Sequence, residues 1–150
     1  MVLKVSTVVL ALICWITSAT AEVVLNGDRG GRIGTYVNRA NDLRSSGESI
    51  RVAGLCASAC TILVAAALPG RVCVTPQASL GFHSAWDYDG NGQPVVNPEA
   101  TQLLMALYTP HMRAWVRTHG GLTPRMIFLQ GRELQRMFPL CKQTATYARY

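Results

Sequence analysis

The sequence contains few charged and few aromatic residues, and no segment is dominated by one residue type. Of its 150 residues, 15% are charged and 7% are aromatic, whereas 49% are hydrophobic. This apolar fraction excludes an intrinsically disordered chain and is sufficient for a packed core. Thirteen glycines and seven prolines without a repeat exclude collagen-like and low-complexity architectures. The length predicts a single domain.

Acidic residues are scarce, and no complete metal-binding motif is present. Eight Asp and Glu against fourteen Lys and Arg give a net charge of +6, but the basic residues are scattered, so we expect no nucleic-acid partner. Residues 87–92 match the first half of a calcium-binding loop, with Asp87, Asp89 and Asn91 at ligand positions. The twelfth position is Pro98 instead of a bidentate acid, so we expect no metal and no other cofactor.

The apolar stretch at the N-terminus is shorter than the roughly 20 residues that a membrane-spanning helix needs. Lys4 precedes it, and Ala19-Thr20-Ala21 supplies the small residues of a signal-peptidase site. We therefore expect residues 1–21 to be a signal peptide and residues 22–150 to be the folded domain, in the periplasm or secreted. An uncleaved membrane anchor stays open as the alternative.

Four of the five cysteines lie beyond the predicted signal peptide, at Cys56, Cys60, Cys73 and Cys141. An even number in an exported chain predicts two disulfides. A Cys56–Cys60 bridge is the least favoured pairing, because one cysteine would begin a helix and the other would lie inside it. Of the two remaining pairings we favour Cys60–Cys73 with Cys56–Cys141, because Cys60 should be level with Cys73 on the returning strand.

Short apolar runs alternate with segments of helical periodicity. We predict strands at residues 23–25, 49–55, 71–75 and 79–83, and helices at residues 33–43, 61–68, 98–108, 110–119 and 133–138. Thr109 is predicted to cap the fourth of these helices, with Pro110 at its first position. Residues 86–97 are predicted to form a polar loop. The alternation indicates an α/β fold, with a mostly parallel sheet packed by helices.

Two residues could carry chemistry. Ser58 lies among small residues where a strand ends and a helix begins, and a helix N-terminus favours a nucleophilic oxygen and its oxyanion. His83 closes a strand, where it could act as a general base. From local sequence alone, a helix-capping serine and a structural histidine are the more common roles, since the Gly-x-Ser-x-Gly motif is lacking. Gly30-Gly31 follows a strand and could form an anion cradle.

Taken together, these motifs resemble the proteolytic subunit of Clp protease in the Clp/crotonase superfamily, and its exported bacterial relatives in particular. The segment from Leu25 to Gly31 is similar to the strand and Gly-Gly turn that supply oxyanion-hole amides in that family. The segment from Cys56 to Cys60 resembles the motif around the family's nucleophile, and His83 follows Ser58 at the spacing of the base histidine.

The resemblance spans Val23 to Cys141 and implies a Clp/crotonase-like domain, which the two disulfides predicted from the cysteine count would cross-link. It implies that Ser58 attacks the substrate, that His83 takes its proton, and that backbone amides near Gly31 and Ala59 hold the oxyanion.

The acid of the family's catalytic triad has no clear counterpart. Residues 122–132 contain no Asp or Glu, and Glu133 is the nearest acid. We therefore expect a weak serine hydrolase that acts on a peptide or small ester. The alternative is a catalytically silent, disulfide-bonded binding or scaffold module of the same fold. Either could form a homo-oligomer.

Overall fold

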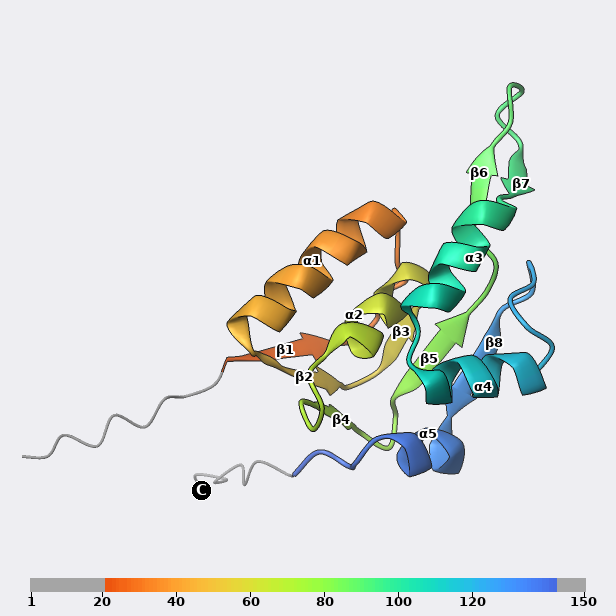
Figure 1. The fold of residues 1–150 in the computed structure, drawn as a ribbon. Helices are drawn as coiled ribbons and strands as arrows, with labels where there is room; N and C mark the ends of the chain where they lie inside the picture. The colour runs from red at the N-terminus through yellow and green to blue at the C-terminus, as the bar shows by residue number, and fades with distance from the viewer. Residues whose placement is uncertain (1–20, 143–150) are drawn as a thin grey trace, which may run out of the picture.

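The computed structural model describes residues 21–142, in which two small sheets and a hairpin are surrounded by helices (Figure 1). The predicted signal peptide lies outside the described residues except for Ala21. The elements follow in the order β1 (Glu22–Leu25), α1 (Ile33–Ser46), β2 (Ser49–Val52), β3 (Leu55–Ala57), the 3-10 helix η1 (Ser58–Cys60), α2 (Thr61–Ala66), β4 (Val72–Val74), β5 (Ser79–Phe82), β6 (Trp86–Tyr88), β7 (Pro94–Val96), α3 (Pro98–Leu107), α4 (Pro110–Thr118), β8 (Ile127–Gln130) and α5 (Gly131–Met137).

The first sheet has the strand order β1-β2-β4, and both of its pairings are parallel. Helix α1 connects β1 to β2 and buries Tyr36, Ala40 and Leu43, which recur at the spacing of one helical face. Gly47 ends α1 in a left-handed conformation, and its amide donates to the Leu43 carbonyl. The predicted strand–helix–strand unit is therefore confirmed in this half of the chain.

The predicted strand at residues 49–55 is instead divided between two sheets. The amides of Ala53 and Gly54 both donate to the Leu25 carbonyl, so the chain bends away from the first sheet at this point. A Cβ added at Gly54 would collide with the side-chain oxygen of Asn26, so a larger residue here would displace that exposed side chain. The bend ends β2 at Val52 and lets β3 begin at Leu55 in the second sheet.

The second sheet has the order β3-β5-β8, with β3 and β5 parallel and β8 antiparallel to β5. Strand β8 was not predicted, because four residues that run directly into α5 show no usable periodicity. It returns beside β5 after α4 and buries Leu129 against Leu80 in the core. With β6–β7 also antiparallel, the structure is a mixed α/β fold, and the prediction of a mostly parallel sheet is wrong.

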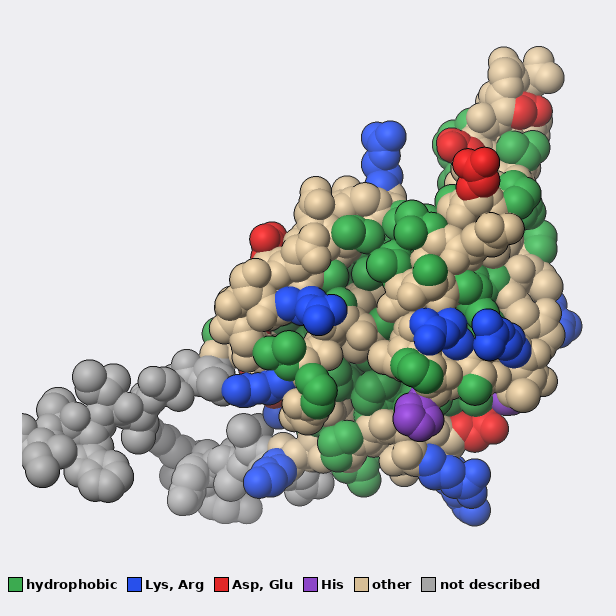
Figure 2. Space-filling view, in the orientation of Figure 1, with side chains coloured by type: hydrophobic (Ala, Val, Ile, Leu, Met, Phe, Trp, Pro, Cys, Tyr) green, Lys and Arg blue, Asp and Glu red, His purple; other side chains and the backbone are tan. Residues whose placement is uncertain are grey.

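Residues 86–97, predicted as a polar loop, form a hairpin of β6 and β7 that projects from the body of the domain (Figure 1). The Asp89 carboxylate accepts hydrogen bonds from the amides of Asn91 and Gln93, so the acid-rich run closes a turn. Apolar side chains on the hairpin are exposed, and Figure 2 shows them along its length. They are Trp86, Tyr88, Val95 and Val96.

Helix α3 follows the hairpin, and α3 and α4 both lie over the second sheet (Figure 1). The Thr109 side chain accepts a hydrogen bond from the Met112 amide, with Pro110 at the first position of α4, as predicted. None of the helices between residues 21 and 142 has both the length and the apolar character that crossing a bilayer requires.

The predicted disulfide pairing is wrong, because the bridges are Cys56–Cys60 and Cys73–Cys141. The chain beyond α5 runs beside β4, where the Val74 amide donates to Pro139 and the Cys141 amide donates to Val74. This brings the Cα atoms of Cys73 and Cys141 to 4.8 Å. The sequence does not reveal that the tail pairs with β4.

Replacing Cys73 and Cys141 by alanine should lower the free energy of unfolding by about 4 kcal/mol, because this bridge closes a long loop in the unfolded chain. The two cysteines are 68 residues apart, against four for Cys56 and Cys60. Denaturant unfolding of the oxidised protein and of both double alanine variants measures the difference. A smaller loss for Cys73/Cys141 than for Cys56/Cys60 would contradict the loop-closure argument.

Candidate functional site

Ser58 occupies a strained turn between β3 and α2. Its φ of 57° is the one positive φ of a non-glycine residue among residues 21–142. A left-handed conformation costs an L-residue roughly 1–2 kcal/mol, so it persists only where the surroundings impose it. The turn runs through η1 directly into α2, which leaves the Ser58 side chain partly buried at the beginning of helical structure.

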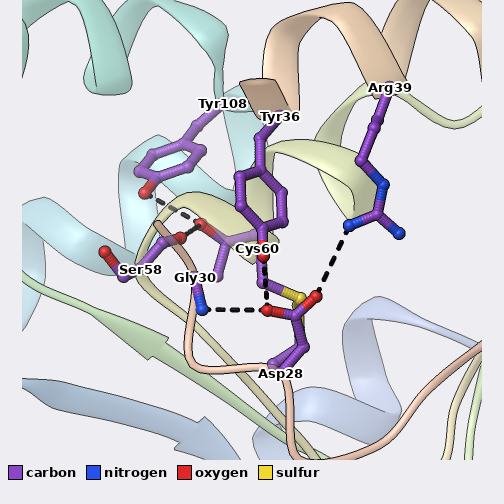
Figure 3. Close-up of a disulfide and its surroundings, with 9 residues drawn as sticks. Asp28, Gly30, Tyr36, Arg39, Ser58, Cys60 and Tyr108 are labelled. Carbon is purple, nitrogen blue, oxygen red and sulfur yellow. Dashed lines mark hydrogen bonds and ion pairs between the residues drawn. A yellow bond between two sulfur atoms is a disulfide. The ribbon is translucent and has the colours of Figure 1, made fainter. Parts of the chain in front are cut away.

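The Cys56–Cys60 disulfide closes this turn (Figure 3). Sequence analysis disfavoured this bridge because it assumed regular helix from the start of the motif. The left-handed Ser58 instead folds the chain back, so that the Cα atoms of the two cysteines lie 5.4 Å apart. Both cysteines are fully buried. Because they precede and follow Ser58 in the sequence, their bridge restrains the backbone on both sides of it.

The predicted Gly-Gly turn lies against Ser58 and contacts it through Gly30. A Cβ added at Gly30 would lie 2.7 Å from the Ser58 Cβ and 2.8 Å from the Ala59 nitrogen, closer than real contacts allow. Gly30 also has a φ of 82°, which favours glycine. The structure therefore brings Gly30 against Ser58 and Ala59, whereas a Cβ added at the neighbouring Gly31 would meet only the Tyr36 ring, at 3.6 Å.

Asp28, which sequence analysis did not single out, fixes this loop (Figure 3). Its Oδ1 accepts hydrogen bonds from the Gly30 amide at 2.9 Å and from the Tyr36 hydroxyl at 2.6 Å. Its Oδ2 lies 3.8 Å from a guanidinium nitrogen of Arg39. Burial, together with the hydrogen bond and the negative charge of Asp28, raises the pKa of Tyr36 to about 12. An Asp two residues before a Gly is a turn signal that could have identified it.

The carbonyl of Ser58 is held by a buried pair of hydroxyls. The Thr61 hydroxyl donates to this carbonyl at 2.7 Å and lies 3.0 Å from the Tyr108 hydroxyl. A carbonyl can only accept, so Thr61 uses its one proton there and the Tyr108 hydroxyl donates to Thr61. Tyr108 is 2% exposed, and its burial raises its pKa to about 12.

His83 lies at the same edge of the second sheet as Ser58. In the parallel pairing of β3 and β5, Ala57 is level with Gly81, so Ser58 and His83 both leave the carboxyl ends of neighbouring strands. His83 follows directly after the end of β5 and is partly buried. Within residues 21–142, its ring makes no hydrogen bond and no ion pair, so no acid orients it there.

Glu133 is the acid nearest in the sequence to the position that the resemblance implies for the acid of a catalytic triad. Its carboxylate interacts with other residues than His83. Its carboxylate accepts a hydrogen bond from the Trp115 indole at 3.3 Å and lies 3.8 Å from the His119 ring. The Trp115 and His119 rings are stacked with centroids 4.1 Å apart. Glu133 therefore links α5 to α4. In the part of the chain that the structure describes, no three His, Cys, Asp or Glu side chains are grouped to hold a metal ion.

Comparison with known protein families and with curated proteins finds no match for this chain. The resemblance to the Clp/crotonase superfamily therefore stays a hypothesis.

The stability of the protein should fall as the pH rises above 10, because the folded state holds the Tyr108 proton up to a pKa of about 12. The unfolded chain releases this proton near pH 10, so alkali favours unfolding. The loss from Tyr108 alone should be about 1 kcal/mol between pH 9 and pH 11. Denaturant unfolding at both pH values should show a smaller loss in Tyr108→Phe. An unchanged loss in that variant would contradict the assignment.

Proposed function

We propose that this protein is a serine hydrolase in which Ser58 is the nucleophile and His83 is the general base. One observation carries the proposal. Ser58 lies in a left-handed turn closed by a disulfide, at the sheet edge that His83 shares. A strained strand-to-helix turn is the position from which hydrolase serines present their hydroxyl, and strain of this kind concentrates at functional sites.

In this mechanism the Ser58 hydroxyl attacks the carbonyl carbon of an ester or peptide while His83 takes its proton. The carbonyl oxygen becomes an oxyanion, and the amides of Gly31 and Ala59 donate to it. The Gly30 amide already donates to Asp28, which leaves Gly31 as the donor from that loop. His83 returns the proton to the leaving group, and water then cleaves the acyl-enzyme with His83 again as base.

The proposed enzyme is slow and prefers esters to peptides. In a complete triad the acid fixes the tautomer and orientation of the histidine, and disturbing that alignment costs about 10⁴ in turnover. No acid bonds to the His83 ring within residues 21–142. An ester has the better leaving group and depends less on protonation by the histidine.

The proposal includes a Clp/crotonase-like domain and export to the periplasm or beyond the cell. The parallel strand–helix–strand units and the order Gly30, Ser58, His83 support the first part. Two disulfides are consistent with an oxidising compartment and support the second. Lys4 and the Ala19-Thr20-Ala21 segment remain the sequence basis for a signal peptide.

The unoriented ring of His83 favours a second candidate function. A catalytically silent module of the same fold would keep the disulfides and the Gly30 contact for stability and would need no acid. The two candidates differ in whether Ser58 reacts with an electrophile that requires an activated hydroxyl.

A fluorophosphonate probe on the folded, oxidised protein tests the proposal. Labelling should occur at Ser58, disappear in Ser58→Gly, and slow by about 100-fold or more in His83→Ala. Glycine is chosen at position 58 because it accepts the left-handed φ without strain. His111→Ala is the matched control, because His111 is exposed on α4 and should not alter the rate. If the wild-type protein keeps its fold but is not labelled, the hydrolase proposal is wrong and the catalytically silent module is the supported function.

Removing the Cys56–Cys60 bridge should abolish labelling even where the protein stays folded, because the left-handed turn would relax. The Cys56→Ala/Cys60→Ala variant is compared with Cys73→Ala/Cys141→Ala at a temperature where circular dichroism shows both folded. Equal labelling rates in the two variants would show that the bridge serves stability alone.

A further inference from the structure

We propose that Asp28 is a positioning residue of the same site, and that its carboxylate keeps the Gly30-Gly31 loop against the Ser58 turn during acyl transfer. This inference rests on the proposed function, since its consequence is the reactivity of Ser58. Asp28 touches neither the nucleophile nor the proposed base by any hydrogen bond between residues 21 and 142.

The backbone of Asp28 is anchored to the strand that leads to Ser58. Its amide donates to the Leu55 carbonyl at 3.0 Å, and its carbonyl accepts from the Ala57 amide at 2.8 Å. These two bonds form an isolated parallel bridge between Asp28 and Cys56 of β3. These backbone bonds alone therefore fix Asp28 relative to the Ser58 turn, without any contribution from its side chain.

The side chain of Asp28 then sets the direction of the loop. Oδ1 accepts from the Gly30 amide, which turns the chain so that Gly30 meets Ser58 and the Ala59 nitrogen. Gly30 has no side chain with which to hold this position. The Asp28–Gly30 bond is thus the side-chain contact that orients the proposed donor at Gly31.

The same carboxylate binds the helix that follows the loop. Tyr36 and Arg39 both belong to α1, so Asp28 joins the start of the loop to the element that leaves it (Figure 3). Asp28 is 22% exposed at its side chain, whereas Arg39 is 47% exposed, so the hydrogen bonds are better shielded from water than the ion pair. The position of the Gly30-Gly31 loop should therefore depend more on an acceptor oxygen at residue 28 than on a negative charge there.

The unequal roles of the oxygen and the charge of Asp28 can be separated with a conservative variant that should keep the activity. Asp28→Asn keeps an oxygen that accepts from Gly30 and Tyr36 but has no charge for Arg39, whereas Asp28→Ala removes all three contacts. Asp42→Ala is the matched control, because Asp42 is an exposed acid of the same helix region with no ion pair among residues 21–142. Each variant is treated with a graded series of fluorophosphonate concentrations, which separates probe binding from the rate of bond formation.

We expect Asp28→Ala to lower the rate of bond formation by about 100-fold, the effect of losing one oxyanion donor, with little change in probe binding. Asp28→Asn should stay within about 3-fold of the wild type, and Asp42→Ala should match it. If Asp28 had a merely structural role, its replacement would weaken probe binding and bond formation together. Alternatively, the labelling rates of Asp28→Asn and Asp28→Ala would fall in proportion to their loss of stability. Either of those results would overturn the inference.

The two proposals fail in distinguishable ways. If the wild type is labelled at Ser58 and Asp28→Ala is labelled equally fast, the hydrolase stands and the positioning role of Asp28 is overturned. If the wild type is not labelled, both are overturned. Amide hydrogen exchange at Gly30 then shows whether Asp28 still protects that amide as a purely structural contact.

Discussion

The arrangement of the site depends on one constraint, which is the closure of the Cys56–Cys60 disulfide around a left-handed Ser58. The bridge offsets the strain of that conformation and fixes the end of β3 relative to the beginning of α2. The other contacts assume this geometry. Gly30 can approach only because the turn presents the Ala57 carbonyl and the Ala59 nitrogen to it. Thr61 can reach the Ser58 carbonyl only because η1 runs without interruption into the helix.

Local signals predicted most of the elements. The Gly47 stop, the Thr109 cap and the strand–helix–strand unit from Glu22 to Val52 follow from turn chemistry and periodicity, which act over a few residues. Two of the failures involve pairing between distant segments. The tail beside β4 and the antiparallel β8 depend on tertiary contacts that no short window contains. The hairpin was missed because its exposed apolar residues alternate with turn formers that indicate a loop.

The candidate site was predicted in part. Ser58 and the Gly30-Gly31 turn were identified from small residues at strand ends, and the structure brings them into contact. His83 was predicted as the last residue of a strand, and the structure ends that strand one residue earlier, at Phe82, on the neighbour with which β3 pairs. Asp28 was not identified because its role depends on a helix residue eight positions later, in Tyr36. The Cys56–Cys60 bridge was rejected for a physical reason that fails once the backbone between the cysteines is left-handed rather than helical.

The two disulfides also differ in when a growing chain can form them. Cys56 and Cys60 are four residues apart, so both thiols are present as soon as that short segment has been made. Cys73 has no native partner until Cys141 has been synthesised 68 residues later. During that interval Cys73 is a free thiol only 13 residues from Cys60. If the Ser58 turn is oxidised first, Cys60 is no longer available to Cys73, and the Cys56–Cys60 bridge then leaves Cys73 and Cys141 to pair with each other.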